Sequence, residues 1–145
     1  MCGISGFLNL NNNFSHNDLK KFSLSMSSTL ERRGPDSFGI WVEKEKKLTL
    51  SHRRLSIIDL NERSDQPMHS INGRFVIVYN GEIYNYLEIK EKLIKKNVKF
   101  KTDSDTEVIL ESISEFGLED GIKQLEGMFS IAVWDKKLKN LFLIR

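Results

Sequence analysis

Apolar and polar positions along this chain fall into short blocks, some with helical spacing and some typical of strands. Apolar residues recur every three to four positions between capping residues in three segments, 15–30, 86–96 and 105–116. Runs rich in β-branched and aromatic residues predict strands over 3–10, 40–43, 48–52, 55–60, 75–79, 128–134 and 141–144. Because strands and helices do not alternate regularly, the order predicts an α+β fold without internal repeats.

The ends of the predicted helices carry recognisable capping signals. In the first helix Ser15 is the expected N-cap, with Asp18 three residues later as the acid of a capping box. Its apolar stripe, predicted to face the core, consists of Leu19, Phe22, Met26 and Leu30. Gly34-Pro35 then ends the helical pattern.

The other two helices are bounded in the same way. Asn85 is the expected cap of the second. Ser104 caps the third, Glu107 completes a capping box, and Gly117 ends that helix.

Composition narrows the class of protein. The chain has 145 residues, a hydrophobic fraction of 39% and a formal net charge of +2, which suit one globular domain. Basic residues form no stripe interleaved with aromatic ones, so nucleic-acid binding is not indicated. We also expect no membrane association, because no apolar run has membrane-spanning length and no secretory signal is visible. The single cysteine fits a reducing cytoplasm.

That cysteine is Cys2, directly behind the initiator Met1. Removal of Met1 would leave one residue with both a thiol and a free α-amino group. A thiol reacts as its thiolate, and an α-amino group titrates near pH ~8, so nucleophile and base would belong to the same residue. The alternative is that Cys2 is only a small buried apolar residue.

Three further segments have both a structural and a functional interpretation. Arg54 follows an apolar run, where a buried guanidinium needs an ion-pair partner or a ligand; the structural alternative is a salt-bridged arginine on an edge strand. Asn80-Gly81 is typical of a tight turn, but an Asn amide and a Gly N–H can also stabilise one oxyanion. Asp105 is part of a helix cap, and its carboxylate could also bind the ammonium of an amino acid.

Together these motifs closely resemble the glutaminase domain of class II glutamine amidotransferases, in particular the asparagine synthetase branch. The resemblance covers the whole chain and rests on Met1-Cys2-Gly3-Ile4, Arg33-Gly34-Pro35-Asp36, His52-Arg53-Arg54-Leu55-Ser56-Ile57, Gln66-Pro67-Met68, Asn80-Gly81-Glu82-Ile83-Tyr84-Asn85, Ser104-Asp105-Thr106-Glu107 and Gly127-Met128-Phe129.

The resemblance implies a role for each matching residue. Cys2 would attack the side-chain amide of glutamine, with its own α-amine as the base. Asn80 and Gly81 would form the oxyanion hole. The residues implied to bind the substrate are Arg54 at the α-carboxylate, Asp105 and Glu82 at the α-ammonium, and Leu55 and Ile57 through backbone groups. No metal is implied for this half-reaction.

The resemblance also implies the fold of N-terminal-nucleophile (Ntn) hydrolases, a four-layer αββα sandwich with two mainly antiparallel sheets. Residues 1–145 would then be one class II glutamine amidotransferase domain, expected to be truncated at its C-terminal end. Ammonia would pass to a synthetase domain or subunit that amidates aspartate or another acceptor. ATP and magnesium are expected only for that domain, because this chain has no Ser-Gly-Gly loop of the ATP-pyrophosphatase type.

Two other functions stay open from the sequence. One is a non-catalytic remnant or partner module that binds glutamine without turnover. The other is an Ntn hydrolase that acts on a different amide, which the pairing of Arg54 with Asp105 disfavours because these residues suit an α-amino acid.

Overall fold

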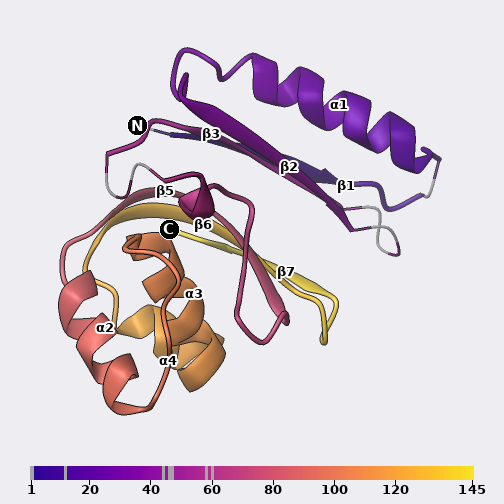
Figure 1. Cartoon of the computed structure of the whole chain (residues 1–145). Coiled ribbons are helices and arrows are strands. Elements are labelled where there is room, and N and C mark those ends of the chain that lie inside the picture. The colour runs from indigo at the N-terminus through magenta and orange to yellow at the C-terminus, as the bar shows by residue number, and fades with distance from the viewer. Residues whose placement is uncertain (1, 12, 44, 46–47, 58, 60) are drawn as a thin grey trace.

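The structure is a computed structural model that describes residues 2–11, 13–43, 45, 48–57, 59 and 61–145. Two antiparallel sheets pack face to face, with one helix outside the first sheet and a group of helices outside the second (Figure 1). These four layers, helix–sheet–sheet–helix, confirm the α+β class and the predicted αββα sandwich.

In the described part of the chain, the first sheet contains three strands and the second contains four. In the first, β3 (Leu48–Arg54) lies between β1 (Gly3–Leu8) and β2 (Ser37–Glu43). The order in the second is β4 (Met68–His69), β5 (Phe75–Ile83), β6 (Gly127–Asp135) and β7 (Asn140–Ile144). Arg54 therefore ends the central strand of its sheet, so the alternative of an arginine on an edge strand does not hold.

The outer layers are helical. The first consists of α1 (His16–Ser28), and the second of α2 (Tyr86–Lys95), α3 (Asp105–Phe116) and α4 (Leu118–Lys123). A 3₁₀ turn, η1 (Glu62–Ser64), lies in the loop between β3 and β4. No helix in the described part of the chain is both long and apolar enough to cross a bilayer.

Side-chain alternation along β5 builds two separate cores. Val76 and Val78 face the other sheet and pack with Leu48, Leu50 and Trp134. The alternate residues of β5 face α3 and α4, and this second cluster contains Phe75, Ile77, Tyr79, Ile109, Leu110 and Ile113. A strand buried on both faces reads as a continuous apolar run, which explains why 75–79 is apolar throughout.

The buried face of α1 coincides only in part with its predicted apolar stripe, since Leu19 is buried but Phe22 and Met26 are not. Its capping box, Ser15 with Asp18, is present, but its buried residues are Leu19, Ser23 and Ser27. Of the predicted stripe, Phe22 and Met26 are more than a third exposed. The reason lies in the sheet beneath, where Arg53 Nε donates to the main-chain O and to Oγ of Ser27 at 3.2 and 3.1 Å.

The segment 55–60, predicted as a strand, forms none in its described residues; Ile58 and Leu60 lie outside them. β3 ends at Arg54, and the chain then turns, because the Ser56 N–H donates to Asp36 Oδ2 at 2.7 Å. The following Asp59 has a left-handed backbone, with φ 51°. The described residues of this segment thus form a loop held by side chains.

Two other local expectations were wrong. Asn80-Gly81 forms no turn, because β5 continues through both residues to Ile83. Ser104 caps α3 as expected, but the Glu107 carboxylate does not complete the capping box. It accepts from the N–H groups of Lys101 and Thr102 instead.

Candidate active site

One cavity of about 690 Å³ opens at the end of the two sheets, and all eight residues singled out from the sequence line it. They are Cys2, Arg54, Leu55, Ile57, Asn80, Gly81, Glu82 and Asp105. This volume is typical of a small-molecule site. Segments more than 100 residues apart in the chain therefore converge, as the sequence analysis expected, although convergence alone assigns no role to any of them.

Cys2 immediately precedes β1 and is partly buried. The backbone N–H of Leu55 lies 3.4 Å from its Sγ atom and points at the sulfur. The same sulfur also lies 3.7 Å from the Leu55 carbonyl oxygen, to which the thiol donates. Arg33 holds the Cys2 main chain, since its Nε donates to the Cys2 carbonyl at 3.2 Å.

The Arg-Gly-Pro-Asp segment braces the same region. A Cβ atom on Gly34 would lie 2.3 Å from the carbonyl oxygen of Arg53, so only glycine allows this close approach. Asp36 N–H donates to the Arg54 carbonyl at 3.0 Å, and the Asp36 carboxylate receives the Ser56 N–H. The segment therefore fixes the chain on both sides of Arg54 and Leu55.

The edge of β5 presents a row of backbone donors to the cavity. β4 pairs only with Val76 and Ile77, so beyond them this edge of β5 meets no further strand among the described residues. The Tyr79 N–H donates to Gln66 Oε1 at 2.6 Å, and the Ile83 N–H reaches Asp105 Oδ2 at 3.4 Å. Since alternate N–H groups of a strand point to the same edge, the Gly81 N–H lies between these two and faces the cavity.

Asn80 and Gly81 line the cavity side by side near the end of β5. In the described part of the chain, the Asn80 carboxamide makes no hydrogen bond to protein. A Cβ at Gly81 would lie 2.2 Å from the Met128 carbonyl oxygen, because β6 packs against this point of β5. Any larger residue would displace the strand edge that carries both donors.

Asp105 is the first residue of α3 and is 6% exposed. The Tyr79 hydroxyl donates to its Oδ2 at 2.8 Å. Burial raises the pKa of Asp105, partly offset by the hydrogen bonds it accepts, and burial beside Asp105 also raises the pKa of Tyr79. A buried carboxylate without a cation beside it is a good partner for a ligand ammonium.

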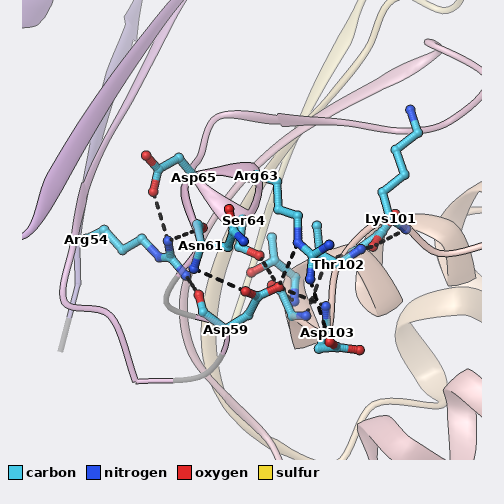
Figure 2. A network of polar contacts seen from close by, with 12 residues as sticks. Arg54, Asp59, Asn61, Arg63, Ser64, Asp65, Lys101, Thr102 and Asp103 are labelled. Carbon is cyan, nitrogen blue, oxygen red and sulfur yellow. Dashed lines mark hydrogen bonds and ion pairs between the residues drawn. The ribbon is translucent and has the colours of Figure 1, made fainter.

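Arg54 is 6% exposed and is held by several oxygen acceptors, as Figure 2 shows. Its guanidinium donates to Asp65 Oδ1 at 2.9 Å, to the Asn61 carbonyl at 3.0 Å, and to the Asp59 carbonyl. Arg54 thus has the ion-pair partner that the structural interpretation required, and it also lines the cavity.

Several residues that contact the site were given no role in it from the sequence. Tyr79 and Asp65 contact Asp105 and Arg54, respectively. Gln66 bridges β5 and α3, since its Nε2 donates to Thr106 Oγ1 at 3.1 Å. Gln66 could have been found from the Gln-Pro-Met motif, whereas Tyr79 is masked by the apolar run around it.

A buried histidine links the two sheets beside the cavity. His52 of β3 is 1% exposed, and its Nε2 lies 3.1 Å from the carbonyl oxygen of Tyr79 on β5. Burial lowers the pKa of His52 to about 4, so the ring is neutral near pH 7 and Nε2 carries the proton that is donated.

The side chains that commonly bind metal ions do not gather in one place in the described part of the chain. Among the described residues, no group of three or more His, Cys, Asp or Glu side chains is placed to hold a metal ion.

Comparison with protein families places the chain. The model of the family described as "Glutamine amidotransferase domain" matches residues 1–145. The chain belongs to this family.

Its relatives include much longer proteins. A putative glutamine-hydrolyzing asparagine synthetase of Methanocaldococcus jannaschii is 36% identical over the whole chain, and asparagine synthetase 2 of Bacillus subtilis is 39% identical. An amidase of Gibberella zeae, chry2, is 34% identical. The chain spans 30%, 19% and 22% of these three proteins.

A solved structure shows the same fold. The glutamine phosphoribosylpyrophosphate amidotransferase of B. subtilis, in complex with ADP and GMP, superimposes with a TM-score of 0.68 at 18% identity. The match covers 92% of this chain and 34% of that one. This confirms the Ntn-type amidotransferase fold that the sequence motifs predicted.

Proposed function

We propose that this chain hydrolyses the side-chain amide of glutamine to glutamate and ammonia. The observation that carries the proposal is one cavity lined by a cysteine at position 2, two candidate oxyanion donors, a buried arginine (Arg54) and a buried acid (Asp105). Membership of the glutamine amidotransferase family supports it.

The chemistry follows from the donors and acceptors present. After removal of Met1, the α-amine of Cys2 takes the thiol proton, and the thiolate attacks the amide carbon. The oxyanion that forms is stabilised by the Asn80 carboxamide and the Gly81 N–H. The ammonium of Cys2 then returns the proton to the departing nitrogen, so that ammonia leaves and a γ-glutamyl thioester remains. Water, activated by the same amine, hydrolyses the thioester and regenerates Cys2.

Substrate recognition uses the two charged ends of the amino acid. Arg54 offers a planar fork that suits the α-carboxylate, and Asp105 with Glu82 provides negative charge for the α-ammonium. Main-chain groups of Leu55 and Ile57 line the same cavity. Specificity for glutamine over a simple amide then comes from the Arg54–Asp105 pair.

We further propose that the ammonia serves a synthetase domain or subunit in the cytoplasm. The named relatives that are glutamine-hydrolyzing asparagine synthetases support this, with aspartate as the first acceptor to test. Any requirement for ATP and magnesium belongs to that partner and not to the glutaminase step.

The test combines Cys2 chemistry with the processing of Met1. Purified protein should release ammonia and glutamate from glutamine, and its intact mass should lack Met1. Cys2→Ala should abolish ammonia release with circular dichroism unchanged, and a glutamine-like chloroketone should label Cys2. Activity that persists in Cys2→Ala, or an active sample that retains Met1, would refute the mechanism. Glutamine binding without turnover by the unmodified protein would favour the non-catalytic alternative.

A further inference from the structure

The carboxylate of Asp59 is the centre of the polar network that flanks the cavity (Figure 2). Its side chain is 7% exposed. Oδ1 accepts the Asn61 N–H at 3.1 Å, and Oδ2 accepts the Ser64 hydroxyl at 2.8 Å and the Asp103 N–H at 2.9 Å. Arg63 Nε lies 3.6 Å from Oδ2. Asp59 itself is not among the residues that line the cavity.

These contacts join two segments that are distant in the sequence. The hydrogen bonds to Asn61 and Ser64 shape the loop after β3. In the same loop, the main-chain carbonyl of Asp59 accepts from the guanidinium of Arg54, the last residue of β3. The bond from Asp103 reaches the turn that leads into α3. Asp59 is therefore the described residue whose main chain contacts Arg54 while its side chain contacts the turn before Asp105.

The turn before α3 cannot move independently of the helix. Glu107, in the first turn of α3, accepts the N–H groups of Lys101 and Thr102 at 2.9 and 2.7 Å. Ser104 then caps the helix through Thr106 N–H at 3.0 Å. The hydrogen bond that holds Asp103 consequently also holds the N-terminal end of α3, where Asp105 lies.

The Asp59 carboxylate is ionised over the physiological pH range. Hydrogen bonds from the Asp103 N–H and the Ser64 hydroxyl lower its pKa to about 2. An ionised carboxylate offers acceptors on both oxygens, whereas an amide has one acceptor and one donor end. In Asp59→Asn, the NH₂ group would face either the Asn61 N–H or the Asp103 N–H, and one tether would be lost.

We propose that Asp59 is a positioning residue that sets the separation between the Arg54 guanidinium and the Asp105 carboxylate. It thereby selects ligands that carry a carboxylate and an ammonium on the same carbon. The inference rests on the proposed function, since it assigns those two groups to the two ends of glutamine. Cys2, Asn80 and Gly81 have no contact with Asp59, so the chemical step itself is outside its influence.

The experiment compares ligands with two charged ends and with one. Asp59→Asn should raise KM for glutamine about tenfold, the equivalent of one lost hydrogen bond, with kcat within about threefold of the parent. The inhibition constant of L-glutamate should rise in parallel. That of glutaramic acid, which lacks the α-amino group, should change by less than about threefold, because a one-ended ligand does not sense the separation.

Asp135→Asn is the matched control. Asp135 is also a buried carboxylate that pairs with an arginine, Arg74, and accepts two backbone N–H groups, but it lies at the far end of β6. Its substitution should lower the melting temperature and leave the ratio of the two inhibition constants unchanged. A loss of stability alone therefore cannot produce the result expected for Asp59→Asn.

Each remaining outcome decides the inference. A parental KM in Asp59→Asn, or an equal loss of affinity for both inhibitors, overturns it while leaving the proposed function intact. If Asp59→Asn does not fold, Ser64→Ala, which removes one donor to Asp59, should shift the same ratio in the same direction, and an unchanged ratio overturns the inference. A parent protein that binds no glutamine overturns the function and the inference together. If the parent binds without turnover, dissociation constants from calorimetry replace KM, and the same ratio decides.

Discussion

Asn80 shows how the structure changes the meaning of one residue. As a dipeptide, Asn-Gly favours a turn, yet here it lies within β5 and faces a cavity that also contains Cys2. The strand therefore places Asn80 on the same cavity as Cys2. Under the proposed function, its amide stabilises the negative charge that develops on the oxyanion.

We expect Asn80→Ala to lower kcat by about 10²–10³, as removal of one oxyanion donor does elsewhere, with little change in KM for glutamine. Steady-state ammonia release measures both constants. Asn72→Ala, which removes an amide from a turn and its bond to Ser114, is a control with the expected kcat of the parent. A rise in KM alone would make Asn80 a binding residue.

At the scale of secondary structure, α1 shows that apolar spacing does not identify the buried face of a helix. Leu19 is fully buried with Ser23 and Ser27, while Phe22 is 39% exposed. Small serine side chains let the helix approach the sheet and leave room for Arg53. The phenylalanines gather outside instead, where the Phe14 and Phe22 rings meet edge to face with centroids 5.0 Å apart.

This arrangement makes the stability of α1 depend on one large side chain. Leu19→Ala should cost about 2–5 kcal/mol, the usual range for a fully buried leucine. Phe22→Ala should cost about 1 kcal/mol or less, because that ring is partly in water. Urea denaturation of the two variants measures the difference. Equal costs, or a larger cost for Phe22, would mean that the helix packs on its apolar stripe.

At the scale of the whole molecule, the two sheets are joined by apolar packing and by one buried polar contact. Leu48, Leu50, Val78 and Trp134 form the apolar part. His52 supplies the polar part through its bond to the Tyr79 carbonyl. Among the described residues, no partner reaches His52 Nδ1, so a second proton on the ring would be buried without an acceptor.

Stability should therefore fall as the pH decreases from about 6.5 to about 4. In that interval His52 becomes protonated in the unfolded chain, whereas folded His52, with a pKa of about 4, stays neutral. The full loss is about 3 kcal/mol. The measurement is the unfolding free energy of the parent and of His52→Gln across this pH range. The difference between the two proteins separates the contribution of His52 from that of the carboxyl groups.

The glutamine side chain can still donate to the Tyr79 carbonyl, so His52→Gln keeps the sheet contact but cannot take up a proton. The parent should lose stability as the pH falls, and the difference in unfolding free energy between the parent and His52→Gln should therefore become smaller. Parallel pH curves would mean that His52 does not titrate differently in the folded and unfolded states.

The motifs and apolar runs by themselves determined most of the strands, three of the helices and eight of the residues that line the cavity. These features depend on local preferences, such as that of Ser104 for a helix N-cap, and on short motifs that can be recognised in the sequence itself. The tertiary structure alone decided the rest. Partners far along the chain settle two of these points: Met128 packs where Asn80-Gly81 continues as strand, and Arg53 sets the buried face of α1. Glu107 points to the turn at 101–102, six residues before it, which the capping motif did not reveal. The role of Asp59 also belongs to the tertiary structure, because its carboxylate reaches Asp103 only when the chain after β3 folds against the start of α3.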